Sequence, residues 1–238
     1  MQARHPLLLG HRGARRGAPE NTFAAFDKAL RDGCAGFEFD VRLTADGCTL
    51  ICHDPHLQGL EIASSTLAAL SAVPSAEKSR SAASSGEKPC CLEEVLESYS
   101  QRAYLDIELK VAGLEEPSLE ALRRCPAARG GVISSFLPEV LWRLAELQAK
   151  RGEHFPLGLI FARREQMRGW ERLPISHLMP RHELLDRALL SEFHAAGKQV
   201  FAWTVNRARE MRRLAELGVD GLISDDTELL SRTFTGSG

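Results

Sequence analysis

The chain alternates between short apolar runs and segments with helical periodicity almost from end to end. The runs with the length and composition of strands are residues 6–10, 36–42, 49–53, 103–110, 131–136, 156–161, 175–179, 199–206 and 218–224. The segments with helical periodicity between them include residues 21–32, 92–99, 138–150, 183–196 and 207–217. This alternation is typical of βα units built around a parallel sheet.

A chain of 238 residues with this pattern has the usual size of a (β/α)₈ TIM-type barrel, an α/β fold. A doubly wound open sheet is the alternative. It is disfavoured because the first predicted βα turn, at residues 10–13, carries neither a GxGxxG nor a Walker A phosphate loop. We expect a single domain over residues 1–238. A short insertion after the third strand, at about residues 55–90, interrupts it.

Within this insertion, residues 64–70 can form a short helix, whereas residues 74–88 are rich in Ser, Ala and charged residues and show no apolar period.

The six cysteines include no CxxC pair, and two of them are adjacent, so we interpret them as reduced thiols. The net charge of −2 gives no basic excess for binding nucleic acid. No apolar stretch reaches the ~20 residues that cross a bilayer. These features predict a cytoplasmic protein with a small-molecule partner and no stable membrane insertion, and they leave the oligomeric state open.

Two of the predicted strands carry charge along one face, because side chains alternate between the two faces of a strand. In the predicted strand at residues 36–42, the charged face consists of Glu38, Asp40 and Arg42. In the predicted strand at residues 103–110, it consists of Asp106, Glu108 and Lys110. Converging carboxylates repel one another unless they bind a cation, and ligand sets made of oxygen atoms suit Mg²⁺ or Ca²⁺. The alternative is a buried network of ion pairs.

Two histidines follow predicted strands, His11 beside Arg12 and His53 beside Asp54. Barrel enzymes carry their active sites at the carboxyl ends of the strands. Imidazole exchanges protons near neutral pH, so this pair indicates an acid and a base, and the guanidinium can hold phosphate oxygens. We interpret the remaining histidines as structural.

The motifs that carry this chemistry resemble the signature of the glycerophosphodiester phosphodiesterase family in both order and spacing. They are Gly10-His11-Arg12-Gly13, Pro19-Glu20-Asn21-Thr22, Glu38-Phe39-Asp40, His53-Asp54 and Glu108-Leu109-Lys110. The resemblance extends over about residues 9–225. It implies a TIM-type barrel that hydrolyses glycerophosphodiesters to an alcohol and sn-glycerol 3-phosphate with one divalent cation, Mg²⁺ or Ca²⁺.

The resemblance also implies roles for individual residues. The implied cation ligands are Glu38, Asp40 and Glu108, with Glu20 as a further candidate. The implied acid and base are His11 and His53, in either order, while Arg12 and Lys110 stabilise the phosphate charge. The implied substrate contacts are Arg12, Asn21, Phe136 and Trp203. Asn21 can equally be a helix N-cap, and core packing is the alternative for the two aromatic residues.

The chain departs from the family pattern in two places. The segment after Asp54, at residues 55–60, is shorter and less polar than the corresponding segment of many members. This difference leaves the preferred head group open. The last strand reads Ile223-Ser224-Asp225-Asp226, where Thr-Asp followed closely by Pro is commoner, and we expect this change to affect the loop more than the chemistry. Two other functions compete. One is phospholipase D-like hydrolysis of lysophospholipids, which needs an apolar rim, and the other is a catalytically silent barrel that binds glycerol phosphates.

Overall fold

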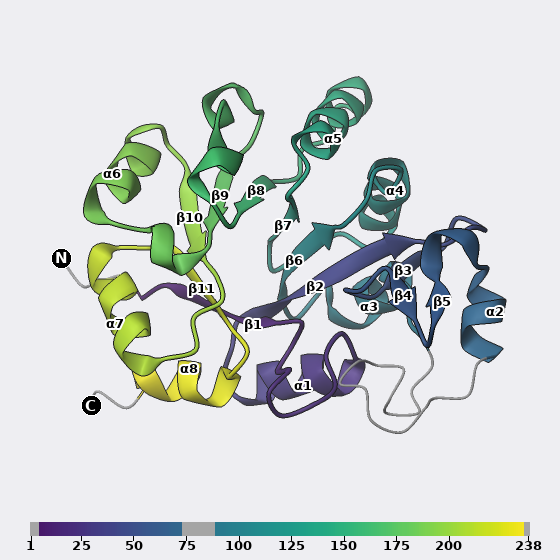
Figure 1. The fold of residues 1–238 in the computed structure, drawn as a ribbon, viewed down its shortest axis with the longest axis horizontal. Helices are drawn as coiled ribbons and strands as arrows, with labels where there is room; N and C mark the ends of the chain where they lie inside the picture. The colour runs from purple at the N-terminus through teal and green to yellow at the C-terminus, as the bar shows by residue number, and fades with distance from the viewer. Residues whose placement is uncertain (1–4, 73–88, 236–238) are drawn as a thin grey trace.

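The computed structural model describes residues 5–72 and 89–235, and in it eight parallel strands close into a barrel (Figure 1). The barrel strands are β1 (Leu7–His11), β2 (Gly36–Leu43), β6 (Tyr104–Leu109), β7 (Gly131–Ser135), β8 (Leu157–Phe161), β9 (His177–Pro180), β10 (Gln199–Ala202) and β11 (Gly221–Ser224). Strand β1 pairs with both β2 and β11, which closes the sheet. The predicted TIM-type barrel is therefore confirmed, and the open sheet is excluded.

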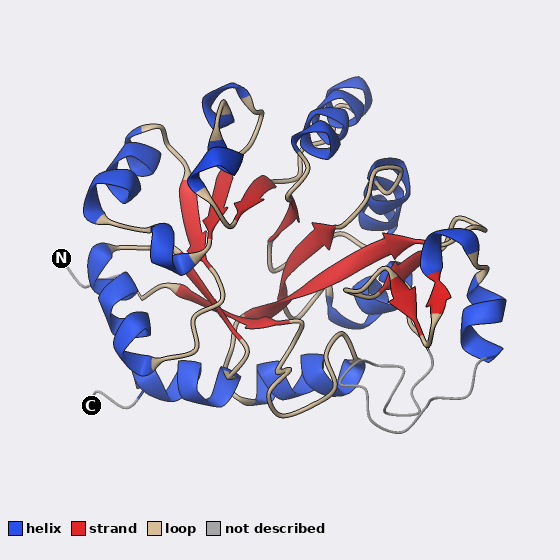
Figure 2. Cartoon of the chain, in the orientation of Figure 1, coloured by secondary structure: helices blue, strands red, loops and turns tan. Residues whose placement is uncertain are grey.

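Helices surround these strands (Figure 2). They are α1 (Phe23–Arg31), α3 (Leu92–Tyr99), α4 (Glu115–Arg124), α5 (Pro138–Arg151), α6 (Arg187–Ala195), α7 (Ala208–Leu217) and α8 (Thr227–Thr235). Helix α1 begins where the Thr22 hydroxyl accepts a hydrogen bond from the Ala25 amide. The sequence analysis did not predict α4 and α8. The early Pro117 in α4 and the threonines of α8 weaken the local helix signal.

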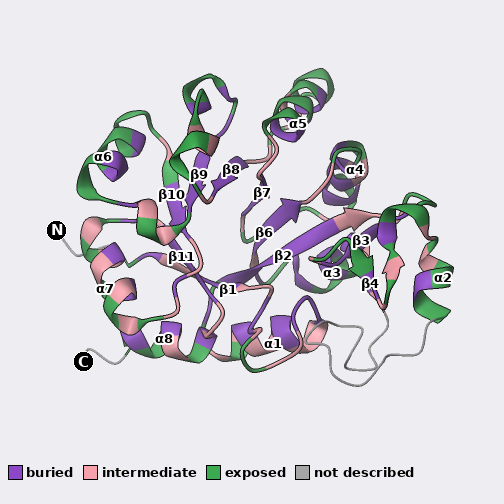
Figure 3. Ribbon diagram, in the orientation of Figure 1, coloured by how far each residue is buried: buried purple, intermediate pink, exposed green. Residues whose placement is uncertain are grey.

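Two apolar layers hold the barrel together, and buried residues follow the strands in Figure 3. Outside the barrel, the rings of Phe26 on α1 and Phe37 on β2 stack with their centroids 4.2 Å apart. Inside it, a second cluster packs together, formed by Leu9, Ile160, Met179, Phe201 and Ile223. The inner cluster leaves the inward faces of β2 and β6 to polar side chains.

The segment predicted as the third strand is not part of the barrel. The part of this segment that forms a strand, β3 (Thr49–Ile51), pairs antiparallel with β2. It is one arm of a hairpin that continues β2 beyond the barrel and then turns back. The returning arm brings the Cys52 amide to the Asp40 carbonyl, 3.0 Å away, and so places His53 at the rim despite the reversed direction.

The predicted insertion follows β3. It contains the two-stranded pair β4 (His56–Leu57) and β5 (Leu60–Glu61), and then α2 (Leu67–Ala72), which confirms a short helix there. The segment predicted to be solvated, residues 74–88, lies outside the described residues.

Cys48 and Cys91 form a disulfide between the β2–β3 turn and the start of α3, so the prediction of reduced thiols is wrong for these two residues. The sequence could not reveal a pair that folding brings together across 43 positions.

Within residues 5–72 and 89–235, no helix has both the length and the apolar character that a bilayer span requires. The cytoplasmic location stays a prediction.

Candidate active site

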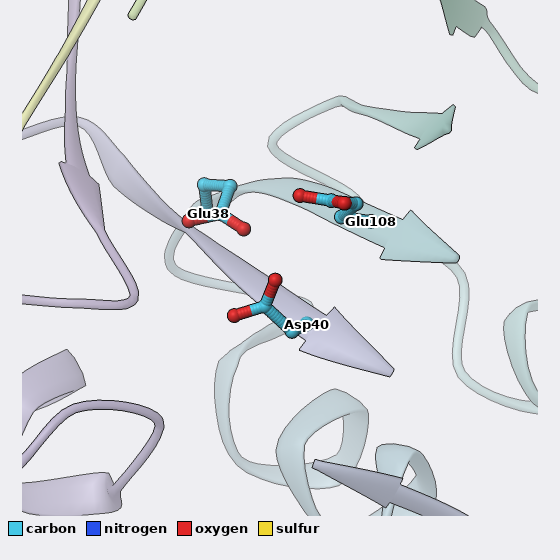
Figure 4. Close-up of side chains that lie close together, drawn as sticks. All are labelled: Glu38, Asp40 and Glu108. Carbon is cyan, nitrogen blue, oxygen red and sulfur yellow. The ribbon is translucent and has the colours of Figure 1, made fainter. Parts of the chain in front are cut away.

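Strand pairing brings the predicted acidic residues together on the inner faces of β2 and β6. In this pairing Glu38 is opposite Asp106 and Asp40 is opposite Glu108. Ligand oxygens of Glu38, Asp40 and Glu108 lie within 4.8 Å of one another, and all three residues are buried (Figure 4). The alternation of side chains along two separate strands thus places these carboxylates in one cluster.

The electrostatics of this cluster fit a divalent cation. Burial raises the pKa of Glu38 well above its usual value, and Asp40 and Glu108 raise it further. Burial, followed by Asp40, raises the pKa of Glu108 to about 7. Among the described residues, Glu38 Oε1 is buried without a hydrogen-bond partner. Buried carboxylates that repel one another and have unused oxygens are a ligand set for a hard cation such as Mg²⁺ or Ca²⁺.

This electrostatic arrangement predicts a pH-dependent response to cations. Without a cation, the raised carboxyl pKa values make the folded chain bind more protons than the unfolded chain. Stability therefore falls as pH rises from the usual carboxyl value of 4.5 through about 7. We expect Mg²⁺ at a hundred times its Kd to raise the Tm by roughly 5–10 °C at pH 8, and by less at pH 5.5, where protons compete for the ligands.

Differential scanning fluorimetry at both pH values, with Mg²⁺ and then with Ca²⁺, checks this prediction. The matched control is Glu120→Gln, which removes an exposed carboxylate paired with Arg123 on α4 and should leave the shift intact. An equal shift at both pH values, or none at pH 8, would contradict a carboxylate site.

His11 lies at the end of β1, and both of its ring nitrogens face carboxylates. Its Nδ1 is 2.6 Å from Asp225 Oδ1, and its Nε2 is 3.9 Å from Glu38 Oε2. Asp225 is itself held by Asn206, which donates from Nδ2 to Oδ2 over 2.7 Å and accepts from the Asp225 amide. Burial raises the pKa of Asp225, but the hydrogen bonds from His11 and Asn206 lower it by more, so the net shift is downward. The carboxylate holds the Nδ1 proton and leaves Nε2 for chemistry.

His53 reaches the same site from the hairpin. Its Nδ1 is 2.7 Å from Asp54 Oδ1, and the Arg42 guanidinium donates to the His53 carbonyl over 2.8 Å. Burial lowers the pKa of His53, and the neighbouring Arg12 and Lys110 lower it further, against the opposing effect of Asp40. The lowered pKa favours the neutral imidazole, the form that can accept a proton.

Two cations lie beside the carboxylate cluster. Lys110 Nζ is 2.6 Å from Glu108 Oε1 and 3.3 Å from Asp40 Oδ1. Arg12 Nε is 3.2 Å from Asp40 Oδ2, and its other end pairs with Glu20 at 2.9 Å. Burial raises the pKa of Asp40, but Lys110 and Arg12 overcome this effect and lower it. The cations thus keep one of the three carboxylates ionised.

Asn21 and Glu20 support these groups. Asn21 donates from Nδ2 to Asp40 Oδ2 over 2.9 Å, while Thr22 caps the helix, so the side chain of Asn21 serves the carboxylate. Asn21 and Arg12 both adopt left-handed backbone conformations, with φ of 59° and 53°. Glu20 pairs with Arg12 and with Arg15 and lies outside the three-carboxylate cluster, so this geometry favours a role in orienting Arg12.

Comparisons with known proteins agree with this geometry. Residues 11–229 match the glycerophosphoryl diester phosphodiesterase family. The chain belongs to this family of enzymes. It is 30% identical over 238 residues to a glycerophosphodiester phosphodiesterase of Caldanaerobacter subterraneus subsp. tengcongensis, with 94% of this chain and 96% of that protein covered.

Solved structures of the phosphodiesterase family share the fold. A phosphodiesterase of Oleispira antarctica, in complex with the product sn-glycerol-3-phosphate, superposes with a TM-score of 0.82 and 28% identity and covers 96% of each chain. A glycerophosphodiester phosphodiesterase of Thermotoga maritima gives a TM-score of 0.76 and 26% identity, with 96% of this chain and 98% of that chain covered.

In this phosphodiesterase the charged groups form one side of a pocket of about 180 Å³, below the ~300 Å³ at which drug-sized sites begin. The other side is apolar and includes Phe136 and Trp203, both predicted as substrate contacts. Their rings meet edge to face with centroids 5.6 Å apart. Trp203 Nε1 donates to the Met179 carbonyl over 2.7 Å, which fixes the indole as a wall. The pocket therefore suits a small ligand with one anionic and one less polar part.

The sequence analysis missed the role of two residues. It interpreted the change at residues 223–226 as one that affects a loop, but in the structure Asp225 Oδ1 lies 2.6 Å from His11 Nδ1, 214 positions away in the sequence. It did not single out Asn206, which holds Asp225. A polar residue at the carboxyl end of a late barrel strand was the available signal, and it was present in both cases.

Proposed function

We propose that this enzyme hydrolyses glycerophosphodiesters to an alcohol and sn-glycerol 3-phosphate, with one divalent cation and with His11 and His53 as acid and base. The observation that carries this proposal is the meeting of both histidines, the carboxylate cluster and two cationic side chains in one pocket. The product-bound Oleispira antarctica relative supports the substrate class. We also infer that residues 1–238 form a single catalytic domain.

Each group has a role that its surroundings support. Arg12 and Lys110 offset the negative charge that builds on the phosphoryl oxygens in the transition state. His53, whose lowered pKa favours the neutral imidazole, suits the base that takes a proton from the attacking hydroxyl or water. His11 takes the opposite role and protonates the leaving oxygen from Nε2, while Asp225 holds Nδ1. After these transfers His53 carries the proton of the nucleophile and His11 has lost its own, and proton exchange with solvent returns both histidines to their starting states.

Glu38, Asp40 and Glu108 would hold the cation, which supplies Lewis-acid stabilisation of the phosphoryl oxygens when bound. Phe136 and Trp203 would face the glycerol or its head group as an apolar wall. Asn21 would keep Asp40 oriented for ligation.

The lysophospholipid alternative needs an exposed apolar rim. Two apolar residues of the insertion that are candidates for such a rim, Leu57 and Ile62, are instead buried in a small core together with Leu50 and Leu70. This packing favours a substrate without an acyl chain.

Release of sn-glycerol 3-phosphate from glycerophosphocholine and glycerophosphoethanolamine tests the proposal. We expect release by the protein as purified with Mg²⁺ or Ca²⁺, loss of release with EDTA, and recovery when cation is added back, because the carboxylate cluster needs the cation to organise charge. Turnover that EDTA does not affect would contradict the cation requirement. If lysophosphatidylcholine alone were hydrolysed, the lysolipid alternative would replace this function.

A second prediction concerns the Asp225 carboxylate. We expect Asp225→Asn to lower kcat by about 10- to 100-fold with KM nearly unchanged, because the amide no longer holds the Nδ1 proton of His11. Steady-state kinetics on glycerophosphocholine measure this. The matched control is Asp220→Asn, which alters a similar pair, His194 Nε2 with Asp220 at 2.9 Å. Equal losses in both variants would point to a general effect on folding.

A further inference from the structure

Asp106 is a polar residue inside the barrel to which neither the sequence motifs nor the proposed mechanism gives a role. It lies on β6 two positions before Glu108, so both side chains share the inner face. Its Oδ1 accepts a hydrogen bond from Ser134 Oγ on β7 over 2.6 Å, and both residues are completely buried. Its Oδ2 is buried and has no hydrogen-bond partner among the described residues.

Asp106 also lines the pocket that holds His11 and Glu38. The lining of this pocket also includes the apolar side chains of Ile160, Met179 and Ile223, while Glu38 is opposite Asp106 in the pairing of β2 with β6. A buried oxygen without a partner is unfavourable, and such atoms are rare in folded proteins. A ligand in this pocket is therefore the natural partner of Oδ2.

The position along β6 indicates which part of a ligand meets Asp106. Residues on a strand advance about 3.3 Å each, so Asp106 lies roughly 7 Å behind Glu108 and roughly 13 Å behind Lys110 along the strand. A phosphate beside Asp106 would face a carboxyl group without its cationic partners. The Lys110 ammonium reaches back to Glu108, with Nζ 2.6 Å from Oε1, so a phosphate held by Lys110 lies about a two-residue step, roughly 7 Å, from Asp106. A hydroxyl group at the far end of a three-carbon chain extends over most of this step and can donate to Oδ2.

We propose that Asp106 binds a hydroxyl of the glycerol moiety, and that Ser134 is the positioning residue that turns its carboxyl group toward the pocket. Asp106 is then a specificity-determining residue that distinguishes polyol phosphates from alkyl phosphates of the same length and charge. This inference rests on the proposed function for the orientation of the phosphate toward Arg12 and Lys110.

Isothermal titration calorimetry with two ligands tests this proposal. sn-Glycerol 3-phosphate and propyl phosphate share the phosphate and the three-carbon chain, and only the first has hydroxyls. We expect Asp106→Leu to weaken the binding of sn-glycerol 3-phosphate by about 10- to 100-fold and the binding of propyl phosphate by no more than about twofold. The near-isosteric Asp106→Asn keeps a carbonyl for Ser134 and an amide for the hydroxyl, so we expect it to retain affinity for both ligands within about threefold.

Ser134→Ala provides a variant that leaves the carboxyl group in place. We expect it to weaken the binding of sn-glycerol 3-phosphate by about threefold to tenfold and to leave the binding of propyl phosphate unchanged, because only the orientation of Asp106 Oδ2 is lost. The Tm of each variant identifies any that fails to fold, and the inference is then decided by the others.

Equal changes for the two ligands, or no change for either, would overturn the role of Asp106. The proposed function fails in a different assay, in which the wild-type enzyme releases no glycerol 3-phosphate from any diester. Because calorimetry needs no turnover, it decides the role of Asp106 in either case.

Discussion

The His11→Ala and His53→Ala variants are expected to lose about 10²- to 10⁴-fold in kcat, the contribution of a positioned acid or base. Both imidazoles hold a carboxylate on Nδ1, Asp225 at 2.6 Å and Asp54 at 2.7 Å, which leaves Nε2 of each for proton transfer. Alanine removes that nitrogen without adding a group that can replace it. Steady-state kinetics on glycerophosphocholine with saturating cation measure the loss.

His194→Ala is the matched control for these variants, because it also removes a histidine paired with a carboxylate, Asp220, but at a partly exposed position outside the pocket. We expect it to retain activity. The lowered pKa of His53 adds a further expectation, since the acidic limb of the pH profile of kcat/KM, set by protonation of the base, should lie below the ordinary imidazole value of 6.5. If His53→Ala kept a near-normal rate, the acid–base assignment would be wrong.

The second large effect is expected at the carboxylate cluster. Glu38→Gln and Asp40→Asn should each lower kcat/KM by about 10³-fold or more, and added Mg²⁺ or Ca²⁺ should not restore it, because a neutral amide is a poor ligand for a hard cation. Activity measured across a cation titration tests this. Recovery at high cation concentration would indicate weakened binding alone and contradict an essential ligand.

Thermal unfolding of the cation-free variants separates the two ligands. Burial and neighbouring carboxylates raise the pKa of Glu38, so Glu38→Gln relieves repulsion and should leave the Tm unchanged or higher. Asp40 pairs with Lys110 at 3.3 Å and with Arg12 at 3.2 Å, so Asp40→Asn leaves buried cations less well compensated and should lower the Tm. A large loss of stability in Glu38→Gln would show that its activity loss reflects unfolding.

Much of the site could be predicted because its signals are local. Alternation along a single strand is enough to place Glu38 and Asp40 on one face, and the same holds for Asp106 and Glu108. The structure brings all four residues to the barrel interior. Helix α3 was predicted at its observed ends, since its apolar period lies within one segment.

The parts that could not be predicted depend on contacts between distant residues. Strand β3 has an ordinary strand composition, and only pairing with β2 decides that it runs antiparallel outside the barrel. The Cys48–Cys91 disulfide joins residues on either side of the insertion. No local pattern distinguishes these outcomes from a barrel strand and two free thiols.

The sequence by itself determined the barrel class, the family and the inward face of the carboxylates, because each is written in short-range periodicity or in motifs of a few residues. Only the tertiary structure decided which partner each group meets, such as Asp225 for His11 and Ser134 for Asp106. The physical reason is that barrel closure and strand register set these distances, and both result from the packing of the whole chain.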